Sequence, residues 1–271
     1  MGSDNEYISK TSLFSYLDAW KDSYTILIPI LLIITAEMLL YAGQMKAGVG
    51  LHVFIILMLS LSLGWLRDSN VAGTFQVLTL LPLLRLLNIS MPVFSETTLY
   101  LYIYIYTPLF FAAYLLLRHE NLAIFQQRFS WEIVTKVVLY IFIAVLIGYA
   151  IAYGEDQIIN AGNLISDLTF FSLLKLSFVM VVFVGFVEEL IFRFLLQTKL
   201  ENSFSRSGGL VLTALVFGVM HSGYGTLYEI AFVTLAGLVL GYMFQRTRSL
   251  FLVSLTHGLT NVILFGLMPF M

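Results

Sequence analysis

The stretch LTFFSLLKLSFVMVVFVGFVEELIFRFLLQ, residues 168–197, is almost entirely apolar but carries Glu188, Glu189 and Arg193. A helix that crosses a bilayer needs about 20 predominantly apolar residues, so this stretch is long enough to span a membrane. An ionised side chain at the centre of such a helix costs roughly 2.5–3.5 kcal/mol on insertion scales. We therefore expect these three side chains to have partners or a function.

The composition of the whole chain indicates a membrane protein. Of its 271 residues, 59% are apolar and 11% charged, and the mean hydropathy is +0.92, whereas soluble domains are about 45–50% apolar and 25% charged. The net charge of -2 argues against nucleic-acid binding, because it offers no basic surface for phosphates. The absence of cysteine excludes disulfides, thiolate metal ligands, a cysteine nucleophile and cysteine-borne lipid anchors.

Long apolar runs predict an all-α fold, a polytopic membrane helix bundle with eight to nine transmembrane helices and short interfacial helices. A transmembrane β-barrel is excluded because the runs do not alternate with period two. The third run contains Pro82 and Arg85, and the count falls to eight if it is re-entrant or interfacial. The nine runs lie near residues 24–41, 49–66, 71–89, 98–117, 133–153, 168–197, 208–222, 226–244 and 250–268.

This pattern predicts that the chain is divided into three parts. Residues 1–23 form a polar leader in which Leu13, Phe14, Leu17 and Trp20 recur at helical spacing, which predicts a cytoplasmic amphipathic helix. Residues 24–160 form an N-terminal transmembrane bundle, and residues 168–271 form the core that carries the polar motifs. The segment 118–132 has the same amphipathic character as the leader and is expected to lie along the membrane.

The distribution of basic residues predicts the orientation, because short cytoplasmic loops are enriched in Lys and Arg. With nine spans, the N-terminus is cytoplasmic and the C-terminus is outside; Lys46 is the one loop cation on the wrong side. The connections near 154–167 and 223–225 contain no Lys or Arg and lie outside in this arrangement. The basic connections are those that carry Arg118 and Arg128, Lys199 and Arg206, and Arg246 and Arg248.

Polar residues recur at helical spacing in the last hundred residues. Glu189 and Arg193 are four apart with the acid first, the favourable order for an ion pair within one helix. Glu188 points about 100° away and stays available for other contacts. His257 and Asn261 share one helix face, and Phe217 precedes His221 by one turn as an apolar wall.

This set of side chains suits the hydrolysis of a peptide bond without a cofactor. Glu188 and His221 can together orient and deprotonate a water, and His257 and Asn261 can act as neutral donors to the oxyanion that forms. A zinc ion held by Glu188, His221 and His257 is the alternative. The chain contains no H-E-x-x-H or G-x-S-x-G motif, which argues against a zincin and a serine hydrolase.

The ordered motifs E-E-x-x-x-R, F-x-x-x-H and H-x-x-x-N on successive helices resemble those of the CPBP family. This family contains CAAX proteases and bacteriocin-processing enzymes, including the Rce1-type prenyl protease. The resemblance covers roughly residues 168–271 and implies catalytic roles for Glu188, His221, His257 and Asn261, with Glu189 and Arg193 in support. It implies an intramembrane endopeptidase that acts on a hydrophobic, lipidated or membrane-anchored peptide.

Other interpretations remain open at this stage. A scaffold or bacteriocin-immunity protein of the same fold would keep the bundle without turnover, and a transporter is less favoured because paired broken helices are lacking. A protease requires the four polar residues to line one cavity, which we expect to be reached from the cytoplasmic side. Elsewhere, Glu37 and Arg85 could pair, and the alternating Tyr100, Tyr102, Tyr104 and Tyr106 favour an interfacial or packing surface.

Overall fold

The computed structural model describes residues 24–66, 69–94, 98–120 and 131–271. Over this part of the chain the protein is 88% helical and contains no strand. Nine of the described helices are long and apolar enough to cross a membrane, which confirms the all-α membrane bundle. The third run is one of the nine, with 22 residues from Asn70 to Met91. The leader 1–23 and most of the segment 118–132 lie outside the described residues.

The first five spans make up the N-terminal half of the bundle. They are the helix Tyr24–Tyr41, α2 (Met45–Ser62), α3 (Ser69–Phe94), α4 (Leu99–His119) and α5 (Trp131–Ile159). The sixth span changes its helix type along its length. It comprises α6 (Phe170–Phe178), the π-helix Val179–Gly185, α7 (Phe186–Glu189), the π-helix Leu190–Gln197 and α8 (Thr198–Ser203).

The last three spans complete the fold. They are α9 (Arg206–Val219), which leads into a 3-10 turn at Ser222–Tyr224, α10 (Leu227–Thr247), and α11 (Leu250–Val262), which continues as a π-helix at Ile263–Leu267. Hydroxyl side chains begin several of these helices by accepting a hydrogen bond from a backbone N–H of the first turn. Ser205 does so for α9, Thr226 for α10 and Ser249 for α11.

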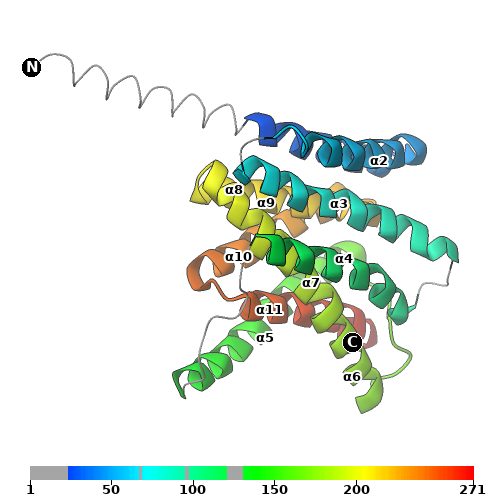
Figure 1. Cartoon of the computed structure of the whole chain (residues 1–271). Helices are drawn as coiled ribbons and strands as arrows, with labels where there is room; N and C mark the ends of the chain where they lie inside the picture. Colours follow the sequence, from blue (N-terminus) through cyan, green and yellow to red (C-terminus); the bar gives the residue numbers. More distant parts are fainter. Residues whose placement is uncertain (1–23, 67–68, 95–97, 121–130) are drawn as a thin grey trace, which may run out of the picture.

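The sixth span crosses the bundle, with Leu190–Gln197 almost entirely buried and α6 projecting from one end (Figure 1). The π-helix Val179–Gly185 packs between α4 and α11, and α11 also packs against α5. On the N-terminal side α2 packs against α3, and α3 against α4. One continuous cluster of buried apolar side chains extends from Ile26 to Val262. The N-terminal helices and the motif-bearing helices therefore share one core.

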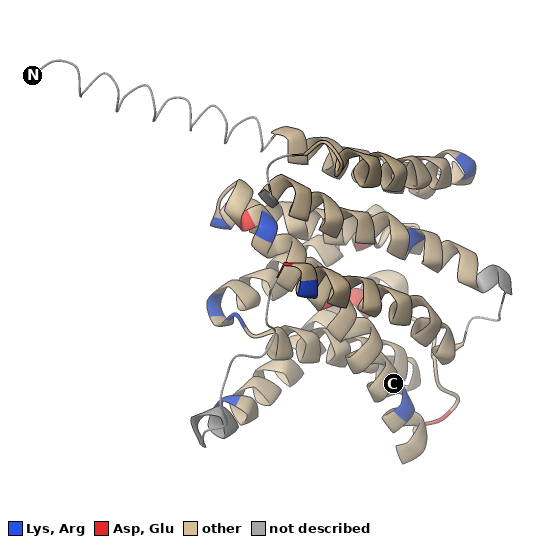
Figure 2. Cartoon of the chain, in the orientation of Figure 1, with Lys and Arg blue, Asp and Glu red and all other residues tan. Residues whose placement is uncertain are grey.

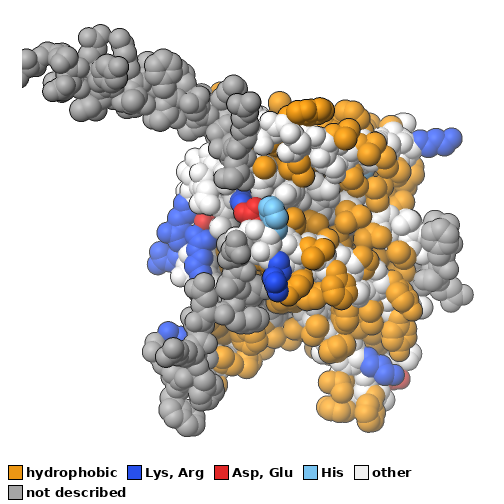
Figure 3. Space-filling model, viewed as in Figure 1, with side chains coloured by type: hydrophobic (Ala, Val, Ile, Leu, Met, Phe, Trp, Pro, Cys, Tyr) orange, Lys and Arg blue, Asp and Glu red, His pale blue; other side chains and the backbone are white. Residues whose placement is uncertain are grey.

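Charged residues are unevenly distributed between the two ends of the helices. Figure 2 shows most Lys and Arg towards the end of the bundle at which α8 and α9 meet, and in Figure 3 hydrophobic side chains cover much of the remaining surface. At that basic end, Lys199 Nζ lies 2.5 Å from Glu120 Oε2 and Arg248 Nη2 lies 2.6 Å from Glu201 Oε2. A helix bundle with apolar sides and a basic end has the distribution of side chains expected of a membrane protein.

The opposite end carries the connection into α6. The Thr169 side chain accepts a hydrogen bond from the Ser172 backbone N–H and so begins this helix. Hydrogen bonds from Thr169 and Ser172 lower the pKa of the exposed Asp167 to about 2. Asp167 therefore stays ionised at neutral pH and adds negative charge to the end of the bundle that has few basic residues.

Candidate active site

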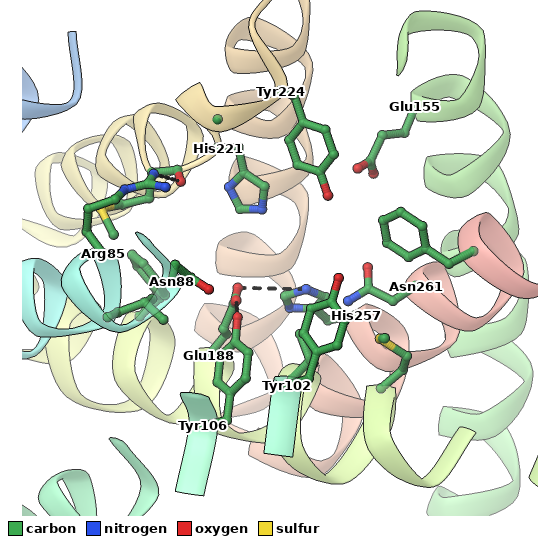
Figure 4. A pocket seen from close by; sticks show the side chains of 17 residues that line it. Arg85, Asn88, Tyr102, Tyr106, Glu155, Glu188, His221, Tyr224, His257 and Asn261 are labelled. Carbon is green, nitrogen blue, oxygen red and sulfur yellow. Dashed lines mark hydrogen bonds and ion pairs between the residues drawn. The ribbon is translucent and has the colours of Figure 1, made fainter. Parts of the chain in front are cut away.

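One cavity of about 250 Å³ gathers the four residues in which the sequence predicts catalytic groups. Glu188 enters it from α7, His221 from the turn after α9, and His257 and Asn261 from α11 (Figure 4). A water molecule in the liquid takes up about 30 Å³, so the cavity has room for several. The structure thus brings together residues that are up to 73 positions apart in the chain, Glu188 and Asn261.

Glu188 has two oxygens in different surroundings. The carboxylate is buried, with 7% of the residue exposed. Its Oε1 accepts a hydrogen bond from the hydroxyl of Tyr106 on α4, whereas its Oε2 lies 3.9 Å from His257 Nε2. The first oxygen is held by the phenol, and the second is the one positioned to act on a molecule between the glutamate and the imidazole.

The neighbouring Glu189 faces the protein interior and is fully buried. Its Oε1 accepts hydrogen bonds from Arg193 Nη1 at 2.9 Å and from His257 Nδ1 at 2.8 Å. The ion pair with Arg193 is the one that the four-residue spacing predicts, and the Arg193 guanidinium also stacks over the Phe217 ring, 4.1 Å from its centroid. The contact with His257 was not predicted from the sequence. Glu189 therefore orients a residue of the cavity as well as compensating a buried cation.

Each of the two histidines is held through its Nδ1. His221 Nδ1 lies 2.9 Å from the Phe217 carbonyl oxygen and must donate to it, which leaves the lone pair of Nε2 free on a neutral ring. His257 Nδ1 donates to Glu189 in the same way. With Nδ1 engaged by Glu189, Nε2 is the ring nitrogen beside Glu188, 3.9 Å from its Oε2.

Close contact between two helices places His257 beside Glu188. A Cβ atom added to Gly185 would lie 2.8 Å from the Gly258 backbone nitrogen, and one added to Gly258 would lie 2.6 Å from the Val181 Cα. Any side chain at either glycine would push α11 away from the π-helix Val179–Gly185. The two glycines therefore set the separation of the helices that carry the carboxylate and the imidazole.

Phe217 lies against both histidines. Its ring centroid is 4.9 Å from that of His221 and 5.8 Å from that of His257, with the latter pair edge-on. The predicted apolar wall beside His221 is present and extends to His257. Since Arg193 stacks on the same ring, Phe217 connects the buried ion pair to both imidazoles.

Several cavity residues come from the N-terminal half and were not predicted as site residues. Tyr102 and Tyr106 line the cavity, whereas Tyr100 and Tyr104 are 55% and 62% exposed. The tyrosine row alternates in sequence, but a helix places residues four apart on one face, and that spacing was the signal for Tyr102 and Tyr106. The other polar lining residues not foreseen are Arg85, Asn88, Glu155 and Tyr224.

The cavity lies towards the end of the bundle that has few basic residues. Its lining includes Tyr102 near the start of α4, Glu155 near the end of α5, and Gly223 and Tyr224 in the turn between α9 and α10. These positions are at the opposite helix ends from Lys199, Arg206 and Arg246. The sequence predicts a cavity reached from the cytoplasmic side, and in the structure the cavity lies nearer the helix ends opposite the basic connections.

The zinc alternative requires Glu188, His221 and His257 to converge on one ion. Among the residues that the structure describes, no three His, Cys, Asp or Glu side chains lie close enough together to hold a metal ion. The proposed ligands Glu188, His221 and His257 line the same cavity, but His221 makes no ion-pair contact with Glu188. Bringing all three onto one ion would require side chains to move.

Comparison with known proteins agrees with the motifs. Residues 170–263 match the family described as type II CAAX prenyl endopeptidase Rce1-like, which confirms the resemblance to CAAX proteases over this segment. The matched segment contains Glu188, His221, His257 and Asn261 together with Glu189, Arg193 and Phe217. No curated protein and no solved structure matches the chain significantly.

Proposed function

From the match of residues 170–263 to a family of membrane proteases, we propose that the protein is an intramembrane endopeptidase of the glutamate type. The observation that carries the proposal is the convergence of Glu188, His221, His257 and Asn261 on one cavity with room for water. A scaffold or an immunity protein would need no such cavity. A nucleophilic water is the reactant because the chain lacks cysteine and no serine elbow precedes the motifs.

In this mechanism Glu188 and His221 activate the water. Glu188 Oε2 accepts a proton from the water as its oxygen attacks the scissile carbonyl, and the unprotonated Nε2 of His221 orients the same water as a hydrogen-bond acceptor. The hydroxyl of Tyr106 holds the other oxygen of Glu188 and fixes the plane of the carboxylate. Glu188 then returns the proton to the leaving amine.

His257 and Asn261 stabilise the charge that develops on the carbonyl oxygen. His257 donates from Nε2 as an imidazolium whose charge is balanced by Glu189, and Asn261 donates from its side-chain amide. Glu189 and Arg193 act through His257 and Phe217 rather than on the substrate. No cofactor takes part.

The substrate is a hydrophobic, lipidated or membrane-anchored peptide. A cavity of about 250 Å³ holds only a short part of a chain, so the remainder of the substrate lies along the bundle or in the bilayer. Peptides with a prenylated CAAX tail are the first candidates, because the matched family is described as a CAAX prenyl endopeptidase. Pheromone or bacteriocin precursors and C-terminal sorting helices are the others.

The test is cleavage of a peptide panel by the purified protein in lipid nanodiscs. The panel contains a prenylated CAAX peptide, its unprenylated form, and hydrophobic precursor peptides, and products are identified by mass spectrometry. Cleavage by the wild type and not by Glu188→Gln supports the proposal. Cleavage that persists in Glu188→Gln contradicts the assignment of the base, and intact peptides throughout the panel favour the scaffold alternative.

A further inference from the structure

A buried polar cluster outside the catalytic cavity joins the N-terminal helices to the segment that carries His221. Glu37, in the helix Tyr24–Tyr41, is completely buried. Its carboxylate accepts hydrogen bonds from Arg85 Nε at 2.7 Å and Arg85 Nη2 at 2.6 Å, and His52 Nε2 lies 3.3 Å away. These residues come from the first three spans and lie outside the segment 170–263 that matches the protease family.

The same cluster holds the residues on both sides of His221. The Ser222 hydroxyl donates to Glu37 Oε2 at 2.7 Å, and Arg85 Nη2 also donates to the carbonyl oxygen of Met220. Glu37 thus contacts the residue after His221 directly, and through Arg85 it fixes the residue before it. Both contacts are buried.

This segment depends on such contacts because the regular helix has ended. α9 ends at Val219, and the His221 backbone has φ -95° and ψ 13°, outside the α-helical values. The ring itself forms one hydrogen bond, to the Phe217 carbonyl oxygen, and packs against the Phe217 and Tyr224 rings. The direction of the ring therefore follows from where Met220 and Ser222 are held.

We propose that Glu37, acting through Ser222 and Arg85, is a positioning residue that aims His221 at the water held by Glu188. The inference rests on the proposed function for its catalytic consequence. The N-terminal helices are then part of the active site rather than a separate membrane anchor. Burying an ion pair such as Glu37–Arg85 costs desolvation free energy, and replacing such a pair by apolar residues is often neutral or stabilising. Stability alone therefore does not explain the pair, whereas its contacts with the residues beside His221 do.

The test compares two small changes with a matched control. Ser222→Ala removes one hydroxyl and leaves the Glu37–Arg85 pair intact, and Glu37→Asp keeps the charge but withdraws the carboxylate by one methylene. Ser254→Ala is the control, because Ser254 is also a buried serine, and its hydroxyl has no hydrogen-bond partner among the described residues. For each protein, kcat, KM and the thermal midpoint are measured on the peptide cleaved by the wild type.

The position of the ring is followed without reference to activity. The chain has four histidines, so NMR spectra of histidine-labelled protein are simple, and His221→Gln identifies the signal of His221. For Ser222→Ala and Glu37→Asp we expect this signal to shift or broaden and kcat to fall about tenfold or more with KM within twofold, because small misplacements of a catalytic group are costly. Ser254→Ala should match the wild type.

Each outcome decides the question. An unchanged His221 signal, or a loss of thermal stability with unchanged kcat, would show that the cluster only joins helices and would overturn the proposal. If the wild type cleaves no peptide, the proposed function fails while the NMR comparison still tests the positioning of His221. If one of the two variants does not fold, the other decides alone.

Discussion

The same isosteric change, Glu to Gln, should have different effects at the two adjacent glutamates, Glu188 and Glu189. Glu188→Gln preserves the size of the side chain and an oxygen that can accept from Tyr106, and Glu188 makes no hydrogen bond to a cationic side chain. We expect its free energy of unfolding to change by about 1 kcal/mol or less, the worth of one ordinary hydrogen bond. Turnover should fall by about two to four orders of magnitude, because the general base is lost.

Glu189→Gln removes a charge that two buried partners need. Arg193 Nη1 and His257 Nδ1 lie 2.9 and 2.8 Å from Glu189 Oε1, and the Arg193 and Glu189 side chains are 0% exposed. Removing one member of a buried ion pair costs about 3–5 kcal/mol. At roughly 2–4 °C per kcal/mol for chains of this size class, the thermal midpoint should fall by about 6 °C or more.

The assay records thermal unfolding and peptide cleavage for both variants in the same nanodiscs. We expect Glu188→Gln to be stable and inactive, and Glu189→Gln to be less stable, with its activity reduced through His257. If Glu189→Gln abolishes cleavage while its thermal midpoint is unchanged, the roles of the two acids are reversed. Full activity of Glu188→Gln would refute the glutamate mechanism altogether.

Three further predictions concern packing, metal content and orientation. Gly258→Ala should lower both the thermal midpoint and kcat because its Cβ would lie 2.6 Å from the Val181 Cα, whereas Gly162→Ala, with no atom within 4 Å of its Cβ, should be neutral in the same two assays. The purified enzyme should contain less than stoichiometric zinc by elemental analysis and survive exhaustive chelation; one zinc per chain, lost and restored together with activity, would contradict the metal-free mechanism. Because the chain has no native cysteine, single introduced cysteines can report its orientation in the membrane. An impermeant maleimide applied to intact cells should label Ser166→Cys and not Ser207→Cys. The reverse pattern would place the cavity on the cytoplasmic side.

Much of the fold and part of the site could be predicted because they depend on local spacing. The nine spans follow from runs of apolar residues, and their boundaries differ from the predicted ones by at most six residues. The ion pair between Glu189 and Arg193 and the stacking of Phe217 on His221 both follow from residues that are one helical turn apart. A periodic pattern along one helix is sufficient for predictions of this kind.

The contacts between helices could not be predicted in this way. Tyr106 reaches Glu188 from 82 positions away, and Ser222 reaches Glu37 from 185 positions away. The nine spans of the described residues are strongly apolar, so hydrophobic periodicity does not indicate which faces meet. The Glu37–Arg85 pair could be suspected because two buried charges need partners, but its connection to His221 required the three-dimensional arrangement.

The helix that carries Glu188 and Glu189 alternates between π-helical and α-helical segments, which affects how its sequence aligns with those of related proteins. The four α-helical residues Phe186–Glu189 lie between two π-helical segments, Val179–Gly185 and Leu190–Gln197. A π-helical turn contains more residues than an α-helical one, and each residue in an α-helix advances about 100°. Deleting a single residue from Val179–Gly185 can convert a π-helical turn into an α-helical one, so that both acids keep their direction relative to α6 and the span is hardly shortened. An alignment of this helix with a relative must therefore permit one-residue gaps inside a transmembrane segment, at the two π-helical places where a residue can be gained or lost without changing the direction of the carboxylates.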